Sequence, residues 1–181
     1  MRTRSLAWVV AGFAALVLMA APSAHAQLNS NQAQVQLNAV LGESLTVSAN
    51  PGLVSFALAG NGVAPGNSAV SITTTWVLDG SRTQVDLYAY FSSTTALTDG
   101  GGNNIPTANV SGSVNGGGFA AFTGGAGPFG AESIQVFSAA ITNANRNGSR
   151  NDTLSLQIDT TALGLPAGTY TGVLNIQAQA I

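Results

Sequence analysis

The chain has 181 residues, of which 45% are hydrophobic and 7% are charged, and its formal net charge is −2. It contains no cysteine and no lysine, and its single histidine is His25, near the N-terminus. This composition excludes thiolate or imidazole metal sites, nucleophiles of the Cys, His or Lys type, and the cationic surface that nucleic acid requires. We therefore expect no cofactor, no metal and no nucleic-acid partner.

The N-terminus has the three-part layout of a secretory signal peptide. Two arginines precede an apolar run over residues 6–21, and Ala24 and Ala26 then provide a small-residue cleavage motif. The competing interpretation is a membrane anchor, but the run is shorter than the ~20 residues that span a bilayer. The sequence thus predicts a signal peptide over residues 1–26 and one domain over residues 27–181. The mature protein is expected outside the cytoplasm, secreted or on the cell surface, with the periplasm left open, and with no membrane span.

Period-two alternation of apolar and polar residues recurs along the rest of the chain and predicts β-strands. The clearest runs are 33–39, 70–78, 85–91, 153–159 and 170–180, and shorter ones are 43–48, 53–59, 109–114 and 132–140. Asp79-Gly80 separates two clear runs and predicts a hairpin turn. Trp76 falls on an apolar strand face, so we expect it in the core. Residues 92–131 are rich in Gly, Ser, Thr and Asn, which favours long loops around one or two short strands.

Many short, half-apolar strands with Gly-rich turns indicate an all-β fold of two antiparallel sheets packed face to face, a β-sandwich. A closed barrel is the less favoured alternative, because the strand lengths and spacings are uneven. No helical period occurs beyond the predicted signal peptide. We expect a single domain held by its core and its sheets, since no disulfide can form.

No catalytic group of acids is apparent. Asp152 and Asp159 are seven positions apart on a predicted strand, which places them on opposite faces and ~23 Å apart. The remaining acids have no visible partner for a paired-carboxylate mechanism. We predict no enzyme activity and no catalytic residues. Tyr88 and Tyr90 alternate out of phase with their apolar neighbours, so they could be exposed on the sheet and contact a ligand such as a glycan.

The predicted strands lack the charges that usually protect sheet edges. Soluble β proteins block their edges with Lys, other charges or Pro, whereas here the outward positions carry mostly Gln, Asn, Ser and Thr. Residues 27–40 form the clearest case, since a Gln/Asn-rich face alternates with an apolar one formed by Ala33, Val35, Leu37 and Ala39. This segment is either the first strand of its own sandwich, which we favour, or a strand that adds to a neighbour's sheet.

The closing stretch over residues 165–176, Leu-Pro-Ala-Gly-Thr-Tyr-Thr-Gly-Val-Leu-Asn-Ile, resembles the last hairpin strand of secreted bacterial fimbrial-subunit and spore-coat-U-type domains. In those domains a Pro-Ala-Gly-x-Tyr corner precedes an alternating strand, and residues 36–47 are loosely similar to their first strands. The resemblance implies an immunoglobulin-like β-sandwich and assembly by strand exchange. Those families often carry a disulfide, which this chain cannot form.

The hypothesis that follows is a secreted, non-enzymatic structural or adhesive surface protein, similar to a pilin or coat subunit. It would associate with copies of itself, or with other surface proteins, by β-strand addition. The alternative is a monomeric extracellular binding module, for carbohydrate, that uses Tyr88, Tyr90 and the loops in residues 92–131. An enzyme comes third.

Overall fold

The computed structural model describes residues 31–125, 128–130 and 132–181. The chain divides into two units, residues 1–39 and 40–181, and all the strands lie in the second. The predicted signal peptide, residues 1–26, lies outside the described residues. The elements of the second unit are β1 (Ser44–Asn50), β2 (Val63–Pro65), β3 (Val70–Val77), β4 (Gln84–Tyr90), β5 (Thr95–Thr98), β6 (Asn104–Pro106), η1 (Thr107–Asn109), β7 (Val110–Val114), β8 (Phe119–Ala121), β9 (Ser133–Ala140), β10 (Asn147–Asp159) and β11 (Asn175–Ala180).

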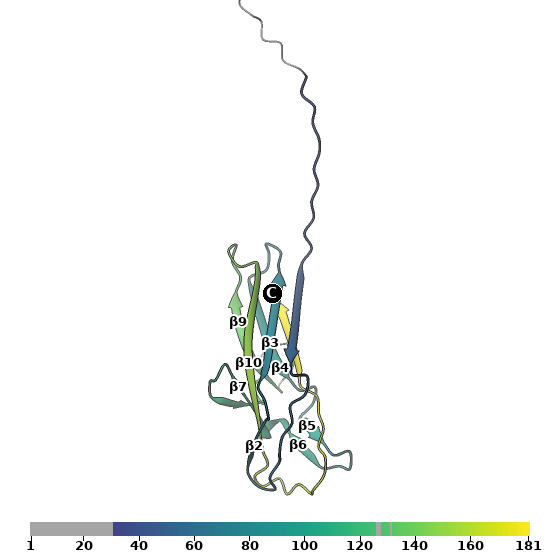
Figure 1. The fold of residues 1–181 in the computed structure, drawn as a ribbon, viewed down its shortest axis with the longest axis vertical. Helices are drawn as coiled ribbons and strands as arrows, with labels where there is room; N and C mark the ends of the chain where they lie inside the picture. Colours follow the sequence, from purple (N-terminus) through teal and green to yellow (C-terminus); the bar gives the residue numbers. More distant parts are fainter. Residues whose placement is uncertain (1–30, 126–127, 131) are drawn as a thin grey trace, which may run out of the picture. The chain divides into compact units, whose positions relative to one another are not determined.

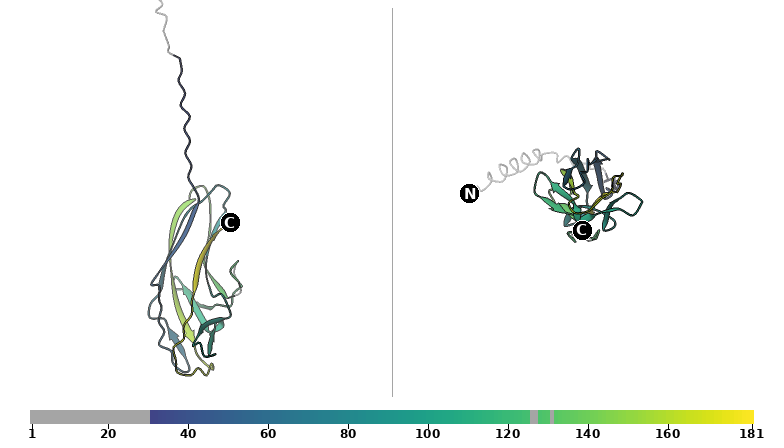
Figure 2. Two further views of the ribbon diagram at one scale, coloured as in Figure 1. Left: turned by 90° about the vertical axis from the view of Figure 1, so that its right-hand side faces the viewer. Right: turned by 90° about the horizontal axis from the view of Figure 1, so that it is seen from below.

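The strands form two antiparallel sheets and one small hairpin. The larger sheet has the order β1-β3-β10-β7-β8, and β2 also pairs with β10. The smaller sheet has the order β11-β4-β9, and β5 pairs with β6. Figure 1 shows β1, in dark blue, and β11, in yellow, along the same side of the sandwich, and Figure 2 shows the layers from a second direction. The predicted antiparallel β-sandwich is confirmed.

The core lies between the two sheets and is built from the predicted apolar faces. β3 alternates strictly, with every second residue from Val70 buried, because side chains along a strand point to opposite faces. Trp76 is 6% exposed, as expected, and its indole N–H donates to the carbonyl oxygen of Asn145 at 2.8 Å. Gly148 of β10 lies opposite Trp76, and a Cβ there would be 2.7 Å from the indole ring. A glycine is therefore needed for the indole to pack flat against the sheet.

Two predicted connections are wrong in detail. Asp79-Gly80 does not close a hairpin, because β3 belongs to the larger sheet and β4 to the smaller one, so the turn crosses between layers. Residues 92–131 contain more strand than expected, namely β5, β6, β7 and β8. Glycine and small polar residues in these strands hide the alternation. The regular turns between them nevertheless allow short ladders to form.

Residues 33–39 are not the first strand of the sandwich, which corrects the interpretation that the alternation favoured. The first strand is β1, which starts at Ser44 and pairs with β3. The described residues 31–43 have no strand structure. The alternating pattern is thus present in the sequence without a sheet partner in this chain.

The predicted strands 53–59 and 170–180 are also only partly formed. In the first, Phe56 makes one isolated bridge to Gly66, and in the second, Thr171 makes one isolated bridge to Thr98 before β11 begins at Asn175. Both segments carry the strand pattern, but each has a partner along one edge only. The side chain of Tyr170 fixes the second segment, since its hydroxyl donates to the carbonyl oxygen of Pro166 at 2.9 Å. Such a corner is typical of sandwich folds.

Candidate functional site

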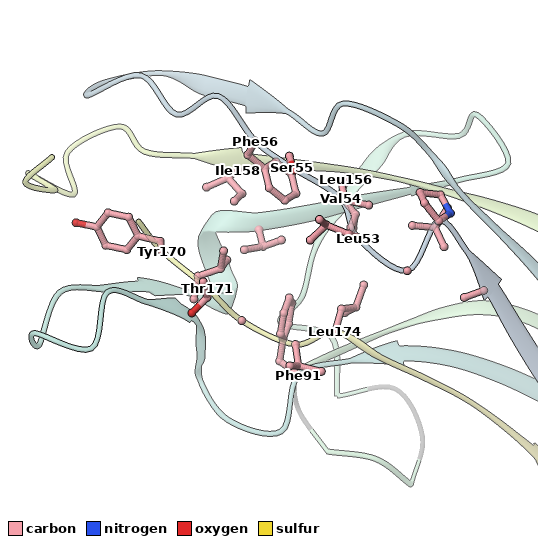
Figure 3. Close-up of a pocket in the computed structure, with 18 of the residues that line it drawn as sticks. Leu53, Val54, Ser55, Phe56, Phe91, Leu156, Ile158, Tyr170, Thr171 and Leu174 are labelled. Atoms are coloured by element: carbon pink, nitrogen blue, oxygen red, sulfur yellow. The ribbon is translucent and has the colours of Figure 1, made fainter. Parts of the chain in front are cut away.

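An apolar groove lies between these two incompletely paired segments. Residues 51–58, which follow β1, contribute one wall, and residues 168–174, which precede β11, contribute the other. The groove encloses about 860 Å³. Figure 3 shows Val54 and Phe56 on one side and Thr171 and Leu174 on the other. We call this feature the lateral groove.

The first wall is a strand edge whose inner backbone groups lack partners. The N–H of Ser55 donates to the side-chain oxygen of Asn67, and the carbonyl oxygen of Ser55 accepts from the N–H of Asn67, both at 2.9 Å. Along an extended chain, successive residues direct their backbone groups to opposite edges. The groups of Val54 and Phe56 therefore face away from Asn67, and among the described residues neither forms a backbone hydrogen bond outside the regular ladders.

The second wall has the same construction. Thr171 both donates to and accepts from the backbone of Thr98, each at 2.9 Å. The backbone groups of Tyr170 and Gly172 must then point to the other edge, and within the described ranges no turn or loop hydrogen bond reaches them. The lateral groove thus has a strand edge on each wall, and both edges are open to a further strand.

The lateral groove is apolar and uncharged. Its inner surface includes Phe91, Val110, Leu156 and Ile158, and none of the residues that line it carries a charge. Phe91, Val110 and Leu156 are buried core residues of both sheets, so the groove opens directly onto the core. On its outer margins, Leu53 is 75% and Val173 is 72% exposed.

The other side of the sandwich is protected by charge. Arg150 donates from Nε to both carboxylate oxygens of Asp152 at 3.0 and 2.9 Å, and its guanidinium carbon lies 4.8 Å from the centre of the Phe137 ring. The hydrogen bond with Asp152 raises the pKa of Arg150. Charges on a strand edge discourage addition of another strand. The lateral groove has no such group.

The apolar side chains of residues 31–41 are the most exposed large hydrophobic groups of the described chain. Val35 is 82%, Leu37 92%, Val40 87% and Leu41 82% exposed. Ala33 and Ala39, on the same face as Val35 and Leu37, are exposed as well. We call residues 31–41 the arm. The predicted strand-addition residues are therefore unburied, and the arm and the groove present apolar surface of matching character.

The arm is attached at the end of the sandwich that lies away from the lateral groove. Glu43, just before β1, accepts hydrogen bonds from the side chain of Arg82, which also donates to the carbonyl oxygen of Ala180 at 3.4 Å. The start of β1 is thus beside the end of β11. The groove is built by the residues after β1 and before β11, at the opposite end of both strands.

Tyr88 and Tyr90 are not the exposed pair that the alternation suggested. Tyr88 is only 6% exposed, and its hydroxyl oxygen accepts from the side-chain amide of Gln135 at 3.2 Å. Phe129, from the loop after β8, stacks on Tyr90 with ring centres 5.0 Å apart and meets Tyr88 edge-on at 5.6 Å. The expectation of exposure is wrong for Tyr88, because a distant loop covers it. The structure does bring both tyrosines together with residues 92–131.

The acidic residues are dispersed among local partners. Asp152 is buried, and the side-chain N–H of Asn115 donates to it at 2.7 Å, while Asp159 caps the N–H of Thr161 at 2.9 Å. Within the described part of the chain, no three or more His, Cys, Asp or Glu side chains group so as to hold a metal ion. In the same residues, no helix is long and apolar enough to cross a membrane.

The geometry of the groove and the arm could not be compared with that of an established relative. No protein-family model matches the chain, and no curated protein matches its sequence. The functional interpretation therefore depends on the arrangement of residues described above.

Proposed function

We propose that the protein is a secreted, non-enzymatic structural or adhesive surface subunit that assembles by β-strand addition, with the arm of one copy lying in the lateral groove of the next. The observation that carries this proposal is the pairing of two incomplete features in one chain. The arm has a strand pattern without a sheet, and the groove has two strand edges without a strand between them.

Alternation in the arm suits a groove that is apolar below and open above. With Val35 and Leu37 directed into the groove, the glutamines between them face solvent. Burial of such side chains stabilises by roughly 1.5–3 kcal/mol each. The backbone of the arm would also satisfy the open groups of Val54 and Phe56 on one wall and of Tyr170 on the other. The inserted residues would thus contribute both apolar burial and hydrogen bonds.

The positions of the two features favour an open-ended assembly. Because the arm is attached at one end of the sandwich and the groove lies at the other, a contact between two copies leaves one free arm and one free groove. Such a head-to-tail interface is heterologous and produces a filament unless rotation closes a ring. A linear, surface-attached or extracellular polymer is therefore the expected product.

The resemblance to fimbrial-subunit and spore-coat-U-type domains agrees with this proposal. The Pro-Ala-Gly-Thr-Tyr corner at residues 166–170 forms the turn that leads into one wall of the groove. Export through the predicted signal peptide would place the subunit where such polymers form. The absence of cysteine leaves strand addition and core packing as the means of stabilisation.

Leu37→Asp tests the proposal, with Gln36→Asp as the matched control. Both variants add one carboxylate to the arm, but only the first places it on the face that would enter the groove. We expect the purified mature wild type and Gln36→Asp to form oligomers in size-exclusion chromatography with light scattering, and Leu37→Asp to remain monomeric. A second variant, Val173→Asp, alters the groove margin and should block assembly in the same way.

A wild type that stays monomeric at high concentration would contradict the proposal. The same conclusion follows if Leu37→Asp assembles as readily as Gln36→Asp. Because Leu37 and Val173 are both exposed, neither substitution is expected to unfold the monomer, and circular dichroism of each variant checks this.

A further inference from the structure

A polar cluster links the base of the arm to the last strand. The Glu43 carboxylate accepts from the N–H of Asp79 at 2.7 Å and from Arg82 at 3.2 and 3.1 Å. Arg82 also donates to the carbonyl oxygen of Ala180, and the N–H of Thr83 donates to the carbonyl oxygen of Ile181 at 2.6 Å. Arg82 therefore joins the beginning of β1 to the end of β11, one strand from each sheet.

This link bears on a competing arrangement that strand addition would otherwise permit. If the chain reversed at Gly42, the arm could run antiparallel to its own β1 and enter the groove from the closed end. Gly42 offers no steric obstacle, since a Cβ at this position would meet nothing within 4 Å. An arm inserted in its own groove would leave the subunit unable to join a neighbour.

Resting on the proposed function, we infer that Arg82 is a positioning residue that disfavours insertion of the arm into its own groove. A strand that reversed at Gly42 would have to pass between β1 and β11, where Arg82 holds Glu43 and Ala180 together. The backbone hydrogen bond from Asp79 fixes Glu43 from the side of the β3–β4 turn. The cluster keeps β1 and β11 closed at this end, while the groove remains accessible to the arm of another copy.

The variant Arg82→Ala tests the inference, with Arg146→Ala as the matched control. Arg146 bonds to the carbonyl oxygen of Gly80 at 2.7 Å on the same turn, but it does not join β1 to β11. We expect Arg82→Ala to raise the ratio of monomer to oligomer roughly two- to fivefold, the range for loss of an exposed ion pair. Arg146→Ala should leave the ratio unchanged. Glu43→Gln keeps the acceptor for Asp79 but loses the charge, so it should move the ratio in the same direction as Arg82→Ala.

Hydrogen exchange of the isolated monomers provides the second readout. We expect the amides of residues 33–39 to be protected in the Arg82→Ala monomer, where the arm occupies its own groove, and unprotected in the wild-type monomer. Equal protection in the two monomers, or an unchanged oligomer ratio in Arg82→Ala, would overturn the inference. If the wild type fails to assemble at all, the proposed function fails. The comparison of arm protection between the two monomers then still decides the role of Arg82.

Discussion

Gly172 lies so close to the backbone of Ala96 that a Cβ on it would be 1.9 Å from the Ala96 carbonyl oxygen. The approach follows from the bridge between Thr171 and Thr98, which holds residues 168–174 against the β5–β6 hairpin. One wall of the lateral groove is thus fixed from behind by a contact that only glycine permits. The rigidity of that wall preserves an opening that a more mobile segment would fill.

The first prediction concerns this contact. Gly172→Ala should lower the free energy of unfolding by about 1–3 kcal/mol, the cost of inserting a methyl group into a packed site. Gly168→Ala is the control in the same segment, because its Cβ would lie 4.0 Å from the Tyr170 ring, an ordinary contact. Urea denaturation of both variants gives the comparison. Equal midpoints for Gly172→Ala and Gly168→Ala would show that the segment moves freely away from Ala96.

A second prediction concerns the charged edge of β10. Arg150→Ala removes the cation from Asp152, a carboxylate that is only 2% exposed and keeps Asn115 as a donor. We expect a loss of about 1.5–3 kcal/mol, as for hydrogen bonds to charged groups. Asp152→Asn should recover part of this loss when combined with Arg150→Ala, since the buried charge is then absent. Thermal and urea unfolding of the two single variants and the double variant measure the coupling, and strictly additive effects would contradict it.

A third prediction concerns acid. Hydrogen bonds from Arg82, from the N–H of Ser81 and from Asn103 lower the pKa values of Glu43, Asp79 and Asp99, respectively. The unfolded chain therefore binds protons more readily than the folded one, and stability is lost as the pH falls through the ordinary carboxyl range near ~4 and below. The urea midpoint should be flat above about pH 6 and should decrease steadily below about pH 4. A midpoint that rises on acidification would contradict the assignment.

The sequence predicted the elements that have complete partners. Residues 70–78 and 85–91 correspond to β3 and β4, central strands whose alternation reflects burial on the core face. It overpredicted strands at 53–59 and 170–174, where the pattern is that of a strand but only one edge is paired. Local alternation records which side chains are buried. It does not record whether a second strand is present alongside.

The candidate site shows the same limit. The arm could be recognised from Val35 and Leu37, because a clean alternation is visible along the chain. The lateral groove could not, since it arises from the spacing of two segments more than a hundred residues apart. The cover on Tyr88 was likewise unpredictable, because Phe129 reaches it from a Gly-rich loop with no regular pattern.

The uncharged lining of the lateral groove has a consequence for the conditions in which a joint made there would persist. Its strength would come from hydrocarbon contact and main-chain hydrogen bonds, neither of which dissolved ions screen as they screen exposed charges. Filaments joined in this way would hold in fresh water and in brine alike, and high ionic strength would tighten them rather than dissociate them.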